Sequence, residues 1–157
     1  MRGVKQQDRV AALQEAGDTT RMPEPVFVAL LLADRVITED NQKKSIIGTF
    51  TQFTVRQVPA GLPPWFVYAA VTNIAGEHPF SLNLVVDRTQ QVIFSAGGTL
   101  RVDEPRRVVE LVIPVPNVVF PEAGTYIVTF HLGGEQIGSR ILDVVQADSP
   151  PQGGPPE

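Results

Sequence analysis

The side chains that could perform catalysis are few, and their spacing does not group them. His78 and His131 are the only histidines, and a catalytic histidine needs a nucleophile and an orienting acid beside it. No serine occupies a Gly-x-Ser-x-Gly elbow, and Ser95 is followed by Ala-Gly-Gly, which is typical of a strand end. His131 alternates with Phe130 and Leu132, so we expect it to face away from the core. We interpret both histidines as solvated and predict that the protein is not an enzyme.

Carboxylates occur in two predicted loops, where they could bind a cation. Calcium takes about 6–8 oxygen ligands, which loops at one end of a β-sandwich can supply together. The candidates are Glu39, Asp40, Asp103 and Glu104. Their spacing matches no EF-hand, and polar residues in turns are the more common explanation. We therefore predict no bound metal and no cofactor, and keep a small-molecule, sugar or calcium-binding sandwich as the alternative function.

The charge and the composition narrow the range of partners and compartments. The formal net charge is -4, and the basic residues Lys43-Lys44, Arg101 and Arg106-Arg107 are too sparse for a nucleic-acid face. The absence of cysteine excludes disulfides and thiolate zinc sites. The longest apolar run, Val26–Ala33, is far shorter than the roughly 20 residues of a membrane-spanning helix. With no signal-peptide pattern at the N-terminus, we predict a cytoplasmic protein that binds neither nucleic acid nor membrane.

Two connections between predicted strands contain unusually many apolar residues, and they form the candidate interaction surface. They are Val58–Trp65, which contains the only tryptophan, and Val115–Pro121. Exposed apolar patches of this kind mark partner surfaces, whereas a single domain mostly buries its large aromatic residues. We favour burial of Trp65 and Phe120, and the alternative to a contact surface is that the second connection folds over the open end of the domain as a lid. The candidate surface residues are Leu62, Trp65, Val115, Val118, Val119 and Phe120.

The elements that would position these residues are β-strands. Phe80–Val86 alternates apolar and polar residues, and Val26–Val36 is nearly continuous in apolar residues, as in a strand covered on both faces. Gly133-Gly134 separates two β-rich runs and predicts a hairpin. Further strands are expected at 45–55, 66–74, 92–96, 99–102 and 108–115, with a bulge or bend at Gly97-Gly98.

The spacing of Glu122, Gly124 and Tyr126 is that of a tyrosine corner, in which the phenol bonds to the backbone a few residues upstream. The pattern therefore predicts an all-β fold, namely an antiparallel immunoglobulin-like β-sandwich of seven to nine strands, with a closed barrel as the second choice. We expect an N-terminal extension over residues 1–25, helical or disordered, the sandwich over residues 26–147, and a disordered Pro/Gly tail over residues 148–157.

Four segments resemble a family of small bacterial proteins known as a domain of unknown function. They are ADRVITEDNQKKSIIGTF (33–50), PPWFVY (63–68), FPEAGTY (120–126) and GGEQIGSRILDV (133–144). The resemblance covers about three quarters of the chain and implies a bacterial, cytoplasmic β-sandwich with no catalytic residues to transfer. From the residues themselves we predict a non-enzymatic interaction or scaffold module, whose partner is another protein or, in a weak homodimer, a second copy.

Overall fold

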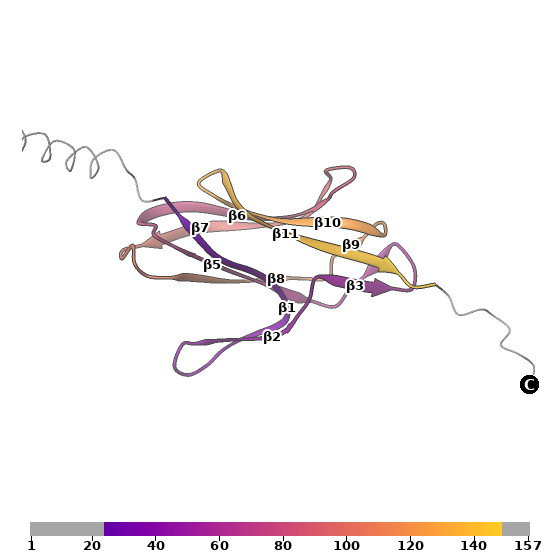
Figure 1. Cartoon of the computed structure of the whole chain (residues 1–157), viewed down its shortest axis with the longest axis horizontal. Helices are drawn as coiled ribbons and strands as arrows, with labels where there is room; N and C mark the ends of the chain where they lie inside the picture. Colours follow the sequence, from indigo (N-terminus) through magenta and orange to yellow (C-terminus); the bar gives the residue numbers. More distant parts are fainter. Residues whose placement is uncertain (1–23, 149–157) are drawn as a thin grey trace, which may run out of the picture.

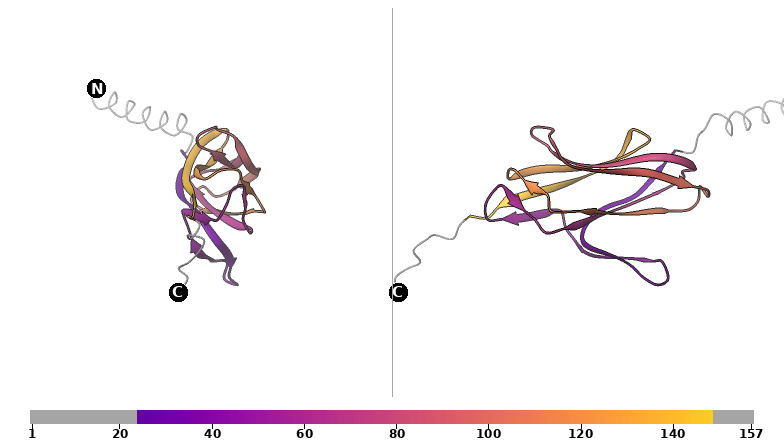
Figure 2. Two further views of the ribbon diagram at one scale, coloured as in Figure 1. Left: turned by 90° about the vertical axis from the view of Figure 1, so that its right-hand side faces the viewer. Right: turned by 180° about the vertical axis from the view of Figure 1, so that it is seen from behind.

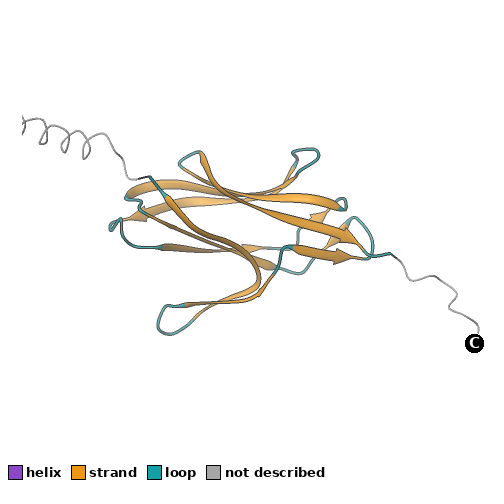
Figure 3. Ribbon diagram, viewed as in Figure 1, coloured by secondary structure: helices purple, strands orange, loops and turns teal. Residues whose placement is uncertain are grey.

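Eleven β-strands make up the described part of the fold: nine form two facing sheets, and two form a short separate pair (Figures 1 and 3). The computed structural model describes residues 24–148, and within that range it contains no helix. One sheet has four strands in the order β2-β1-β5-β8, the other has five in the order β3-β11-β10-β6-β7, and β4 pairs with β9. The strands are β1 (Val26–Thr38), β2 (Lys44–Thr49), β3 (Gln52–Val55), β4 (Ala60–Gly61), β5 (Trp65–Thr72), β6 (Gly76–Val86), β7 (Val92–Val102), β8 (Val109–Val115), β9 (Val119–Phe120), β10 (Gly124–Leu132) and β11 (Glu135–Gln146).

This all-β, sandwich-like fold confirms the predicted class, but the predicted number of strands was wrong. Eleven strands are present instead of seven to nine, because the predicted strand 45–55 is divided between the two sheets, and because β4 and β9 add a short pair. The sheets are also not purely antiparallel, since β3 runs parallel to β11. The predictions for residues 1–25 and 148–157 fall outside the described residues, apart from Glu24, Pro25 and Asp148.

No helix among the described residues is long and apolar enough to cross a membrane.

The core lies between the two sheets and is built by alternation along each strand. In β10, Tyr126, Val128, Phe130 and Leu132 are buried, while the residues between them are half-buried on the outer face. The same alternation holds in β6 from Leu82 to Val86, as the sequence predicted. The Gly133-Gly134 hairpin is also confirmed, with φ of 60° and 84° at the two glycines, as a tight turn between antiparallel strands requires.

Two strands differ from their predicted form for reasons that the neighbouring strands explain. Gly97-Gly98 lies inside the continuous strand β7 and forms no bend. A Cβ at Gly97 would lie 2.8 Å from the carbonyl oxygen of Phe80, so glycine permits the close approach of β6. In β1, a bulge between Phe27 and Ala29 changes which side chains face the core. Val26 and Val28 are consequently exposed, and β1 is not covered on both faces as predicted.

One hairpin extends beyond the sheets. The last residue of β1 that pairs with β5 is Ala33, and from there to Thr38 β1 pairs only with β2. Residues 34–48, which we call the arm, form a two-stranded ribbon that projects from the four-stranded sheet (Figures 1 and 2). Gly48 has a φ of 69°, and a Cβ on it would collide with the side chain of Asp34. Glycine therefore permits the left-handed backbone and the close approach of Asp34 at the base of the arm.

Candidate functional site

The residues predicted as an interaction surface lie at the end of the sandwich where β4 and β9 pair. Ala60 pairs with Phe120 and Gly61 with Val119, so the two proline-rich connections are joined to each other. Trp65, Val115, Val118 and Phe120 are buried, Leu62 is half-buried, and Val119 is 56% exposed. Buried side chains of this connection cover the end of the core, and the apolar surface that the two connections leave exposed consists mainly of Val119 and of prolines.

Tyr126 is fixed beneath this closed end. Its hydroxyl donates to the backbone oxygen of Glu122 at 2.5 Å and accepts from the backbone nitrogen of Glu122 at 3.2 Å. Its ring meets that of Phe120 edge to face, with centroids 5.0 Å apart. Burial raises the pKa of the Tyr126 phenol, so the hydroxyl stays protonated and the interaction is structural.

The Glu122 side chain is bound from outside by Arg88. Two nitrogens of the guanidinium contact the two carboxylate oxygens at 2.7 and 3.1 Å. The hydrogen bond from Arg88 lowers the pKa of Glu122. Because Arg88 is 73% exposed, water screens the pair, and we expect it to add little to stability.

The four candidate calcium ligands do not converge. No group of three or more His, Cys, Asp or Glu side chains suited to a metal ion occurs among residues 24–148. Glu39 and Asp40 lie at the tip of the arm, where the Glu39 carboxylate accepts a short hydrogen bond from Ser45. The Glu104 carboxylate accepts from the backbone nitrogen of Arg106 at 3.2 Å, within the β7–β8 connection. Two of these acids thus act as partners within turns.

The two histidines lie on the neighbouring strands β6 and β10, but they make separate contacts. His78 bonds through Nε2 to the backbone oxygen of Ala75 at 2.7 Å, inside its own turn. His131 lies on the outer face of β10, opposite Ser81 of β6 and Gln136 of β11. Its Nδ1 is buried and has no hydrogen-bond partner among the described residues. His131 faces away from the core as predicted, but it is half-buried and not fully solvated.

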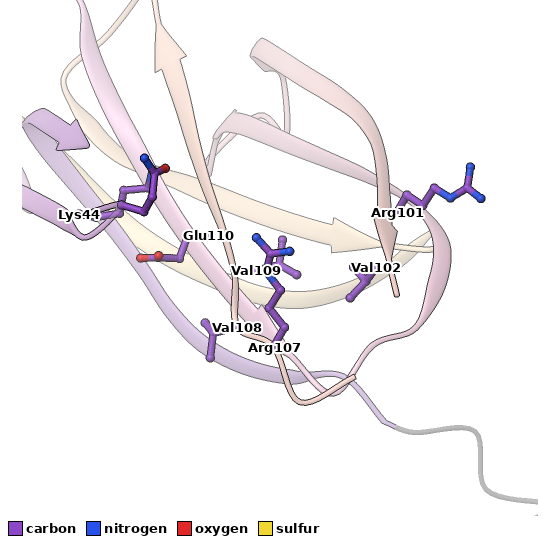
Figure 4. A pocket seen from close by; sticks show the side chains of 8 residues that line it. Lys44, Arg101, Val102, Arg107, Val108, Val109 and Glu110 are labelled. Carbon is purple, nitrogen blue, oxygen red and sulfur yellow. The ribbon is translucent and has the colours of Figure 1, made fainter. Parts of the chain in front are cut away.

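A cleft of about 320 Å³ lies where the arm faces the beginning of β8 and the end of β7 (Figure 4). Figure 4 shows Lys44 and Glu110 at one side of the cleft and Arg101 at the other side. Arg107 lies between the two sides. The rest of the lining is Gln42, Val102, Val108 and Val109. The cleft therefore brings three cationic side chains and one carboxylate together from the arm, β7, β8 and the connection between β7 and β8.

Tyr68 supports this cleft from the strand beside β8. It alternates in β5 with the core residues Val67 and Ala69, so its side chain lies on the other face of the sheet. There its hydroxyl donates a short hydrogen bond to Oε2 of Glu110. Burial, and then the bond to Glu110, raise the pKa of Tyr68 to about 12. The phenol is therefore a neutral donor that holds the Glu110 carboxylate in place.

The cleft is not predictable from the sequence pattern. Lys44, Arg101 and Arg107 were noted only as sparse charges, because they belong to segments far apart in the chain. One feature of the sequence does indicate a polar site here: Tyr68 of β5 lies on the face of the strand opposite to Trp65. A phenol on the outer face of an otherwise apolar strand calls for a polar partner.

The edges of the two sheets also differ in how they are protected. β8 carries Glu110 and Pro114, β3 has only four residues, and β2 belongs to the arm. β7 has eleven residues, no proline and one charged residue, Arg101, and among the strands that the structure describes it pairs only with β6. Long edge strands without proline or several charges can accept another strand. A bulge at Ile93 interrupts the pairing of β7 with β6, but from Phe94 to Val102 β7 is the longest edge of the described chain with neither proline nor several charges.

The comparisons with known proteins give a family and no activity. The model of a family of unknown function, DUF6941, matches residues 28–145, which run from β1 into β11. No curated protein is significantly similar to the chain. The matched region contains every strand that forms the closed end, the cleft and the β7 edge, and by this match the chain belongs to the family DUF6941.

Proposed function

We propose that this protein is a non-enzymatic binding module that takes up an extended segment of a partner protein along β7. The observation that carries the proposal is the unprotected edge of that strand. An added strand would satisfy the free backbone groups of β7, and the side chains along the edge would select its sequence.

Apolar side chains at this edge favour the same use. Phe94 and Ala96 are half-buried on the inner side of β7, and an added strand would cover them further. On the outer face, Ile141, Ile127, Val85 and Val92 form one cross-strand row over β11, β10, β6 and β7. Ile141 is 57% exposed and Val92 52% exposed. Val92 of the edge strand β7 is the last member of the row. A partner strand paired with β7 can therefore place an aliphatic side chain next to Val92.

The experiment is a selection of displayed random peptides, long enough to span β7, against the full chain. We expect selected peptides to be rich in β-branched and aromatic residues. The variant Ala96→Lys places an inward-pointing charge on the edge and should weaken their binding by at least about tenfold, which corresponds to about 1.4 kcal/mol. Ser139→Lys, on β11 away from the edge, is the matched control. Failure to select any peptide, or equal loss in both variants, would contradict strand addition at β7.

We further infer an immunoglobulin-like arrangement of the strands. What supports it is the order in which the chain visits the two sheets: β5 in the first, β6 and β7 in the second, β8 in the first, and β10 and β11 in the second. The bond from Tyr126 to Glu122, at the start of β10, supports the assignment of a tyrosine corner. An experimental structure with a different strand order would contradict this assignment.

A further inference from the structure

The cationic side chains of the arm cleft are poorly neutralised by the protein itself. Lys44 donates through Nζ to the hydroxyl of Thr38 at 2.6 Å, and neither Lys44 nor Arg107 forms an ion pair with a carboxylate of residues 24–148. Arg101 has only a contact of 3.9 Å with Glu77, and both side chains are largely exposed. In a chain with a net charge of -4, such a cluster is a local site of positive potential.

Polar groups that can bind hydroxyl groups lie in the same cleft, and Glu110 is at the side where Lys44 lies (Figure 4). Glu110 has one oxygen, Oε2, bound by Tyr68, which leaves Oε1 free to accept from a ligand. Gln42 lines the same cleft and offers both a donor and an acceptor. Val102, Val108 and Val109 supply an apolar wall. Anionic and hydroxyl-bearing parts of one ligand can therefore bind at neighbouring positions.

We propose that the arm cleft binds a small phosphorylated polyol, such as a sugar phosphate. Arg107 and Lys44 hold the phosphate, with Arg101 at the rim, and Glu110 and Gln42 bind the hydroxyls. Arginine matches phosphate through two parallel hydrogen bonds, and lysine adds a point charge. The volume of about 320 Å³ lies at the lower end of the range for small-molecule sites, which starts near about 300 Å³. The position of Glu110 disfavours a ligand that is only anionic, because such a ligand would meet its charge.

The proposal is tested by calorimetric titration of the full chain with three probes at low ionic strength, where exposed charges are least screened. The probes are inorganic phosphate, ribose 5-phosphate and ribose. We expect ribose 5-phosphate to bind more tightly than inorganic phosphate, and ribose not to bind measurably. Equal affinity for both phosphates would leave an unspecific anion site and would overturn the proposal, as would the absence of saturable binding.

Variants then locate the site. Arg107→Gln should weaken ribose 5-phosphate binding about tenfold, the effect of losing one charge-assisted contact. Arg140→Gln removes an exposed arginine that does not line the cleft and should leave binding unchanged. Glu110→Gln should strengthen the binding of inorganic phosphate while it reduces the advantage of the sugar phosphate. Equal losses in Arg107→Gln and Arg140→Gln, with each variant folded by thermal melting, would place the binding outside the cleft and refute the assignment.

Discussion

Apolar side chains are buried at the end of the sandwich that β4 and β9 close, whereas several remain accessible at the edge formed by β7. At the closed end, Phe120 and Trp65 are 0% and 3% exposed, and two short strands join the proline-rich connections over the core. At the β7 edge, six of the eleven residues are exposed, and within residues 24–148 no strand covers the free backbone groups. The number of apolar residues in a connection therefore does not show whether they are exposed, because the β4–β9 pair buries most of those at the closed end.

The largest expected effect is at the closed end. Phe120→Ala should lower the free energy of unfolding by about 3–5 kcal/mol, because it removes a fully buried ring that contacts Phe53 and Tyr126. Val119→Ala, at the neighbouring exposed position, should change it by no more than about 0.5 kcal/mol. Urea denaturation of both variants gives the comparison. Similar losses in the two variants would show that this end is not packed as described.

Removing the hydroxyl of Tyr126 should lower the stability of the protein more than removing that of Tyr68, and both losses should be smaller than that of Phe120→Ala. Tyr126→Phe removes the hydroxyl that bonds both backbone groups of Glu122, and should cost about 1–2 kcal/mol of stability. Tyr68→Phe removes a bond to Glu110, whose exposed carboxylate water can solvate again, so its cost should be below about 1 kcal/mol. Thermal melting compares them directly. A reversed order would assign the structural role to Tyr68.

Alkaline pH should destabilise the protein through the same two groups. The pKa of Tyr68 is raised to about 12 in the folded chain, and that of an unfolded tyrosine is about 10. Above pH ~10 the unfolded chain loses protons that the folded chain retains, so stability falls as the pH rises toward about 12. Burial raises the pKa of Tyr126 in the same direction. In Tyr68→Phe, the denaturation midpoint should fall less steeply over this range, and an identical slope would contradict the shift.

The weakest expected effect concerns self-association. Since the β7 edge can also accept the same strand of a second copy, we predict weak dimerisation at tens of micromolar, as measured by light scattering. Ala96→Lys should abolish it, and Val119→Asp should leave it unchanged because Val119 lies at the other region. Loss of the dimer in Val119→Asp alone would move the contact to the closed end.

The sequence predicts those parts of the fold that depend on local patterns. The alternation from Phe80 to Val86, the glycine pair at 133–134 and the bond from Tyr126 to Glu122 are each encoded within a few residues, and each is present in the structure. The division of residues 45–55 between two sheets is not local. It depends on Thr51, whose backbone oxygen accepts from Asp143 of β11, and on Phe50, whose nitrogen donates to Leu32 of β1.

The candidate sites depend even more on the tertiary fold. The cleft needs Lys44 of the arm beside Arg107, and only the pairing of β1 with β2 brings them there. The exposure of β7 could not be read from its residues, because an edge strand and a central strand can share one alternation pattern. For the same reason, the buried state of Val115, Val118 and Phe120 follows from the β4–β9 pair and not from their apolar character.

In the proposed function, β7 is the surface that a partner occupies. The most direct measurement is the map of amide chemical-shift changes in the isotopically labelled full chain, titrated with a peptide from the displayed selection. We predict that the largest changes fall on residues 92–102 and on the facing residues of β6, and that residues 58–65 and 115–121 stay unchanged. Changes centred on residues 58–65 and 115–121 instead would contradict the account and return the contact surface to the closed end.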